Sequence, residues 1–307
     1  MKPARGKGVA MTKTVWASIS ALMMLTASAG YAQDKSETDP SSMSDMKRLP
    51  GQPGDNPLQN AQPSRVAQSG PARAAPPSVL AILAHPDDEI TIAPVLARIA
   101  RSGGEVTLIY ATSGDAGPGT SGLEDAGEIA GMREREGRCS AFALGLKEPT
   151  FWNLGDGRLA TMARAPDSAA NRALDNIRAA LAEAQPEVVM TWGPDGGYGH
   201  ADHRMISALV TQVVGEMGPN RPDLLYAAFP QVEAGVLPGF ESWATTAPEL
   251  LTDRIRYGAE DLDATETALR CYESQFPAPA RQALVQLLHG RVWQGQIHFR
   301  AAFSGER

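Results

Sequence analysis

The sequence is poor in cysteine, because only Cys139 and Cys271 occur among its 307 residues. This count excludes a small domain held together by a dense disulfide framework. Neither cysteine lies beside a histidine in the pattern of a catalytic thiol. We therefore expect two buried or paired cysteines, and the sequence leaves open whether they form a disulfide.

Runs of positive charge are also missing beyond the first few residues, and the formal net charge is -7. A protein that binds nucleic acid needs a basic surface that displaces counterions from the phosphate backbone. Internal repeats are absent as well. We expect no nucleic-acid partner.

The N-terminal segment has the pattern of a signal peptide. Basic residues precede the apolar stretch Val15–Leu25, and small residues follow it. This stretch is too short for a comfortable membrane span. We expect cleavage after Ala29 or Ala32, so that residues 1–32 are removed and no stable membrane span remains. An uncleaved anchor is the alternative, and either interpretation predicts a periplasmic or secreted protein.

Residues 33–77 are rich in Pro, Ser, Gln, Asp and Gly, with almost no large apolar side chains. Such a segment buries too little apolar surface to offset its own ordering entropy. We expect a disordered linker here, followed by one catalytic domain at residues 78–307.

Short apolar runs alternate with segments of helical spacing from residue 79 onward. The runs at 79–84, 106–111, 150–154, 188–192 and 224–229 are predicted strands, and 92–100, 124–146, 174–184, 206–217, 264–275 and 279–288 are predicted helices. Continuous apolar runs are typical of strands buried in a parallel sheet. The pattern predicts an α/β fold with a Rossmann-like, doubly wound, mostly parallel sheet and C-terminal helices.

Two polar clusters follow predicted strands, at the edge where an open parallel sheet binds its ligand. The first is Ala84–Glu89 and the second is Gly199–His203, and together they hold three of the five histidines, His85, His200 and His203. Acids that merely cap a helix would explain the first cluster taken alone. A lone histidine is usually a core residue held by hydrogen bonds, but three histidines beside acids favour a metal.

Imidazole and carboxylate ligands suit zinc, and a catalytic zinc takes three protein ligands and leaves a position for water. His85, Asp88 and His203 would be such a set. Zn²⁺ or another divalent metal such as Fe²⁺ is the expected cofactor.

Both clusters resemble the two motifs of the LmbE-like N-acetylglucosaminyl-phosphatidylinositol de-N-acetylase (PIG-L) family of zinc-dependent deacetylases. The first motif, Ala-His-Pro-Asp-Asp-Glu, is matched in full. The second, commonly Gly-His-Pro-Asp-His, carries Ala201 in place of proline. The resemblance covers residues 79–275 and implies that Asp87 is the general base. It assigns the metal to His85, Asp88 and His203.

Weaker similarities lie outside the two motifs. The loop that carries Asp115 and the helix that carries Arg133 resemble family segments, which implies that both residues bind substrate. A solvated helix face of alternating charge is the alternative for Arg133. Tyr272 stands where the family often has histidine, so the role of this position is open.

The expected chemistry is hydrolysis of an amide. Asp87 would take a proton from water, while His200 and Tyr198 are candidate donors to the oxyanion. Asp87 or His200 would then return a proton to the leaving nitrogen. Asp202 would either orient a site imidazole or cap a helix.

The resemblance implies a metal-dependent hydrolase that removes an acetyl or other acyl group from an N-acetylated amino sugar or glycoconjugate, with a small molecule or glycan as its partner. The alternatives are an inactive secreted sugar-binding protein of the same fold and a metal-dependent esterase. Phosphoryl chemistry is less favoured because no phosphate-cradling glycine-rich loop opens a helix after the first predicted strand. The N-acyl substrate, the native metal and the oligomeric state stay open.

Overall fold

The computed structural model describes residues 76–161, 163, 165–232 and 242–303. The predicted signal peptide at 1–32, and all but the last two residues of the predicted linker at 33–77, lie outside this part of the chain. No helix among the residues that are described is long and apolar enough to cross a membrane.

Among the described residues, seven strands form one sheet, in the order β3-β2-β1-β4-β5-β7-β6. Their bounds are β1 Val79–Leu83, β2 Val106–Tyr110, β3 Thr150–Phe151, β4 Val188–Trp192, β5 Asp223–Ala228, β6 Asp253–Arg256 and β7 Gln296–Ala301. The five strands from β3 to β5 pair in parallel, whereas β7 is antiparallel to both of its neighbours. The predicted mostly parallel α/β sheet is confirmed.

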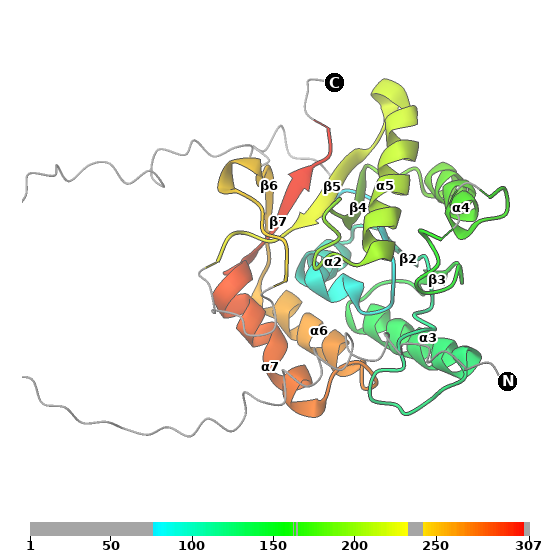
Figure 1. The fold of residues 1–307 in the computed structure, drawn as a ribbon. Helices are drawn as coiled ribbons and strands as arrows, with labels where there is room; N and C mark the ends of the chain where they lie inside the picture. Colours follow the sequence, from blue (N-terminus) through cyan, green and yellow to red (C-terminus); the bar gives the residue numbers. More distant parts are fainter. Residues whose placement is uncertain (1–75, 162, 164, 233–241, 304–307) are drawn as a thin grey trace, which may run out of the picture.

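Helices cover both faces of the sheet (Figure 1). They are α2 Ala93–Arg101, α3 Ala126–Ala143, α4 Ala169–Ala184, α5 Ala201–Glu216, α6 Ala259–Arg270 and α7 Ala278–Leu288, with short helices η1 Asp88–Thr91, η2 Gly218–Asn220, η3 Pro248–Leu250 and η4 His289–Trp293. Helix α4 packs against α5, while α6 packs against α2, α3 and α7.

The centre of the sheet explains where a ligand site can form. All five residues of β1 are buried, as expected of an apolar strand covered on both faces. Strand β1 pairs with β2 on one side and with β4 on the other. The chain therefore leaves β1 toward β2 on one side and returns beside β1 as β4 on the other side. At such a reversal of strand order the carboxyl ends of β1 and β4 border a crevice.

Some predicted boundaries are wrong. The third strand has only the two residues Thr150–Phe151, and α5 begins at Ala201, five residues before the predicted start. Strand β6 was missed because its sequence, Asp-Arg-Ile-Arg, is half exposed at the sheet edge and has no apolar run. Strand β7 was missed because His298 and Arg300 interrupt its apolar residues.

Cys139 and Cys271 form a disulfide, which answers the question that the sequence left open. Cys139 lies in α3 and Cys271 follows the last residue of α6, and their Cα atoms are 5.8 Å apart. The bond joins two helices across 132 positions of the sequence.

Candidate active site

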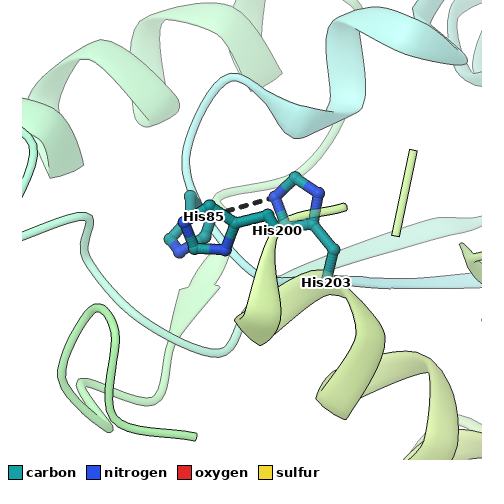
Figure 2. A group of neighbouring side chains, drawn as sticks. All are labelled: His85, His200 and His203. Carbon is teal, nitrogen blue, oxygen red and sulfur yellow. Dashed lines mark hydrogen bonds between the residues drawn. The ribbon is translucent and has the colours of Figure 1, made fainter. Parts of the chain in front are cut away.

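The two predicted clusters meet at the carboxyl ends of β1 and β4. His85 lies in the turn after β1, whereas His200 and His203 lie at the start of α5. Figure 2 shows the three imidazoles gathered together, with a dashed contact between His85 and His203.

Three donor atoms converge as the ligands of one metal would. His85 Nδ1 is 3.2 Å from His203 Nε2, and His203 Nε2 is 3.1 Å from Asp88 Oδ1. All three side chains are buried. Tetrahedral ligands held at metal distances of about 2.0–2.2 Å lie roughly 3.3 Å from one another. The predicted ligand set therefore fits a small divalent cation.

Two further groups could contribute to a metal site, namely His85 with His200 and His203, and His85 with Asp156 and Asp202. The second group contacts the other nitrogen of His85, because His85 Nε2 is 3.0 Å from Asp156 Oδ1 and 3.5 Å from Asp202 Oδ2. A metal-bound histidine usually points its second ring nitrogen at a carboxylate. We therefore favour Nδ1 as the ligand atom, with Asp156 and Asp202 as orienting acids.

Asp88 is held for ligation from one side. Its Oδ2 accepts hydrogen bonds from the N–H groups of Ala84 and His85, both at 3.0 Å, and from the Trp192 indole at 2.9 Å. Burial raises the pKa of Asp88, but His203 and His85 outweigh burial and hold that pKa well below its usual range. An ionised carboxylate with Oδ1 turned to His203 is suited to a cation.

Helix capping does not account for Asp87 and Asp88 of the first cluster. The short helix η1 begins after Asp87, and no side-chain hydrogen bond caps it. Asp88 instead bonds backward to the end of β1, since its partners include Ala84.

The orientation of His203 is set by its neighbours. Its Nδ1 lies 3.1 Å from the carbonyl oxygen of Gly196, which leaves Nε2 for a metal. The Trp192 ring stacks on it at 4.3 Å with an interplanar angle of 8°. Gly197 lets the chain pass this stack, because a Cβ there would lie 2.6 Å from Trp192.

Asp87 and Arg133 form an ion pair at the edge of the cluster, with Arg133 Nη2 3.1 Å from Asp87 Oδ2. Burial raises the pKa of Asp87 to about 7, although Arg133 opposes this shift. A carboxyl group with a pKa near neutral pH suits a general base. Arg133 is only 2% exposed, so the alternative of a solvated helix face is wrong for it.

His200 and Tyr198 supply two neutral donors. His200 Nδ1 accepts the Asp202 N–H at 3.2 Å, so Nε2 carries the ring proton. Burial and the neighbouring His85 and His203 lower the pKa of His200 to about 4, which keeps the ring neutral. Burial raises the pKa of Tyr198, so its phenol stays protonated, and its ring lies 5.2 Å from that of His203.

Asp202 and Asp115 support the loop after β3. The Asp202 carboxylate accepts the N–H groups of Gly157 at 2.6 Å and Leu159 at 3.2 Å. It does not cap α5, whose N-cap is His200. Asp115 Oδ1 accepts the Asp156 N–H at 2.8 Å, so this predicted substrate-binding residue also holds the loop.

Asp156 is a site residue that the sequence motifs do not include. Its side chain is 6% exposed and faces His85. Burial raises its pKa, but the contact with His85 outweighs burial and lowers that pKa to about 2. One feature of the sequence could have indicated it. Asp156 lies between two glycines directly after a predicted strand, at the same sheet edge as the other site residues.

The sequence match agrees with this geometry. Residues 80–214 match the family model PIG-L, described as GlcNAc-PI de-N-acetylase. The matched residues include both motifs and make up less than half of the chain. The 1D-myo-inositol 2-acetamido-2-deoxy-alpha-D-glucopyranoside deacetylase of Corynebacterium glutamicum is 35% identical over 153 residues, which cover 45% of this chain and 53% of that protein. The chain thus spans about half the length of the curated relatives it matches.

Solved structures share the fold of this chain. The N,N'-diacetylchitobiose deacetylase of Pyrococcus horikoshii has a TM-score of 0.54 and 21% identity, covering 73% of this chain and 83% of that one. The 4-carboxy-2-hydroxymuconate hydratase of Pseudomonas putida has a TM-score of 0.55 and 15% identity, covering 75% and 98%. At these identities the likeness extends to the fold alone, and the fold carries more than one reaction.

Proposed function

We propose that the chain hydrolyses the amide bond of an N-acetylated amino sugar or glycoconjugate, with a divalent metal held by His85, Asp88 and His203. The convergence of these three ligands beside the Asp87 carboxylate carries the proposal. The PIG-L match and the deacetylase names of the relatives support acetyl as the group removed.

The proton transfers belong to Asp87. When bound, zinc or iron lowers the pKa of a water from 15.7 to about 7 and polarises a carbonyl oxygen. Asp87, adjacent in sequence to the ligand Asp88, accepts the proton of the attacking water. It then returns a proton to the departing amine, while Arg133 holds the carboxylate in place.

The developing oxyanion needs donors that are already in position. His200 offers its Nε2–H, because its Nδ1 is occupied by the first turn of α5. Tyr198 offers a phenol that stays protonated. A donor of this kind typically contributes about 10² to 10³ in turnover.

We also propose that the mature protein acts in the periplasm or outside the cell. The N-terminal pattern supports export, and the disulfide between Cys139 and Cys271 supports an oxidising compartment, since such bonds are rare in the cytosol. Expression of the full chain with cell fractionation tests this proposal. A mature mass that corresponds to cleavage after Ala29 or Ala32 is expected, and an uncleaved cytoplasmic product contradicts it.

The function is tested with the protein from Gln33 onward. A chelator removes bound metal, Zn²⁺ or Fe²⁺ is restored, and acetate release is followed from a panel of N-acetylglucosamine compounds. Release that requires the restored metal is expected. The O-acetyl ester of the same sugar serves as the comparison for the esterase alternative.

Two outcomes would contradict the proposal in different ways. Stoichiometric metal without acetate release would show that the substrate class is wrong. Sugar binding without bound metal would favour the inactive sugar-binding alternative.

A further inference from the structure

Glu89, the last residue of the first motif, is a fully buried carboxylate that no step of the proposed reaction uses. Its Oε1 accepts the hydroxyls of Ser140 at 2.5 Å and Tyr272 at 2.6 Å. Its Oε2 accepts the Tyr110 hydroxyl at 2.7 Å and the backbone N–H of Asp87 at 3.1 Å. Four donors saturate the two oxygens of a carboxylate.

The contact with Asp87 matters because of the backbone there. Asp87 has a φ of 98°, a left-handed conformation that residues with a Cβ rarely adopt. Such a conformation persists only where the surroundings over-determine it. Glu89 holds the Asp87 backbone through its N–H, and Arg133 holds the Asp87 carboxylate.

The three hydroxyls come from separate elements. Tyr110 ends β2, Ser140 lies in α3, and Tyr272 follows α6. Tyr272, whose role the sequence left open, thus donates its hydroxyl to the Glu89 carboxylate.

A covalent bond joins two of these three elements beside Glu89. Ser140 and Tyr272 each directly follow one cysteine of the Cys139–Cys271 disulfide. The same segments are joined again by Ser274, whose N–H and hydroxyl each donate to Glu136 at 2.7 Å.

We propose that Glu89, Ser140 and Tyr272 are positioning residues for Asp87, and that the Cys139–Cys271 disulfide keeps two of the hydroxyl donors on Glu89. This inference rests on the proposed function insofar as Asp87 is the general base. Loss of a hydroxyl lets Glu89 shift, the Asp87 backbone relaxes from its left-handed conformation, and the carboxylate moves relative to the attacking water. A misplacement of about 1 Å can cost on the order of 10² in rate.

The first test compares Tyr272→Phe with a matched control. Tyr226→Phe removes another buried phenol, whose partner is Thr211 Oγ1 at 2.6 Å, away from Glu89. Both variants are assayed with metal restored and with bound metal measured. We expect kcat to fall on the order of tenfold in Tyr272→Phe, because the Asp87 carboxylate should move by less than about 1 Å. KM and bound metal should stay unchanged, and the control should keep the wild-type kcat.

The disulfide is tested by replacing both cysteines with serine, Cys139→Ser with Cys271→Ser. A similar fall in kcat is expected, and a phosphine reductant should bring the wild type to the same level without affecting the serine variant. If the reductant also lowered the kcat of the serine variant, it would be acting on the bound metal. That result would remove the support for a role of the disulfide.

Conservative substitution separates positioning from structural support. In Glu89→Gln the amide oxygen can still accept the Asp87 N–H, whereas Glu89→Leu offers no acceptor. We expect Gln to retain at least about tenfold more activity per bound metal than Leu. Lower melting temperatures with unchanged kcat throughout would mean a purely structural network and would overturn the proposal.

Hydrogen exchange at residues 84–91 supplies a readout that needs no substrate. Faster exchange of this segment is expected in Tyr272→Phe and in the serine variant, but not in Tyr226→Phe. If the wild type releases no acetate and exchange still accelerates, the proposed function fails while the positioning role stands. If the wild type is active and both kcat and exchange are unchanged in the variants, the positioning role fails alone. If the serine variant does not fold, kcat and hydrogen exchange in Tyr272→Phe and Ser140→Ala decide whether the hydroxyl donors position Asp87.

Discussion

Two regions of the molecule bury a histidine and shift its pKa in opposite directions. At the ends of β1 and β4, burial lowers the pKa of His85, but the carboxylates of Asp156 and Asp202 outweigh burial and raise that pKa well above its usual range. In β7, on the antiparallel side of the sheet, burial and Arg254 lower the pKa of His298 to about 4.

The difference shows that burial alone does not mark a histidine as a metal ligand. His298 has Gln296 as a ring partner at 3.2 Å and a guanidinium as its charged neighbour, so it is a neutral core residue. His85 lies among carboxylates, which together form a place for positive charge.

Removing a histidine from each region should give the largest contrast. His203→Ala takes away one of three ligands, so metal affinity should fall by more than the roughly 10- to 100-fold typical of a lost outer-shell partner, and turnover should be lost. His298→Ala should keep stoichiometric metal. Metal content by mass spectrometry and acetate release measure both. Equal metal content in the two variants would remove the distinction between the regions.

A change beside the ligands should spare the metal and remove the chemistry. Asp87→Asn keeps the shape of the side chain but cannot accept a proton, so kcat should fall by about 10² to 10⁴. Bound metal should be unchanged, because the donor atoms of His85, Asp88 and His203 remain. Near-normal turnover in this variant would mean that another residue is the base.

Tyr198→Phe should have a smaller effect in the same region. The ring contacts with His203 stay, and only the phenol donor is lost. We expect kcat to fall by about 10²-fold, with KM changed less, because the donor acts on the developing oxyanion. A change confined to KM would instead indicate that Tyr198 binds the substrate ground state.

The smallest expected effect is on the free energy of unfolding, and it involves His298 in β7. The pKa of His298 is about 4 in the folded protein and about 6.5 when unfolded. The unfolded chain therefore binds the proton first, and the contribution of His298 to stability is complete above pH 6.5 and declines as the pH falls toward 4. Urea unfolding between pH 7 and 4 should show a shallower decline for His298→Gln. Parallel pH profiles for the two proteins would contradict the assignment.

The parts of the molecule that local sequence determines were predictable. Strand β1 is a continuous apolar run, and His85 and Asp88 follow it within a few residues, so both the strand and its ligands could be named. Strand β6 could not, because at the sheet edge its residues alternate between exposed and half-buried and form no apolar run.

Contacts between distant segments were not predictable. The contact of Asp156 with His85 depends on how the loop after β3 folds over the crevice, which no spacing rule gives. The contact of Tyr272 with Glu89 joins positions 183 residues apart. In both cases the residue type was visible, but its partner was set by the packing of whole helices and strands.

His200 is at once a site residue and the N-cap of α5, so the first turn of a helix determines which ring nitrogen holds the proton. A rotation of the ring would break a backbone hydrogen bond as well as misdirect the donor. The first turn of α5 therefore keeps the His200 proton on Nε2. If this turn frayed, the ring could rotate and the Nε2–H would no longer point at the substrate, even while the rest of the fold stayed intact.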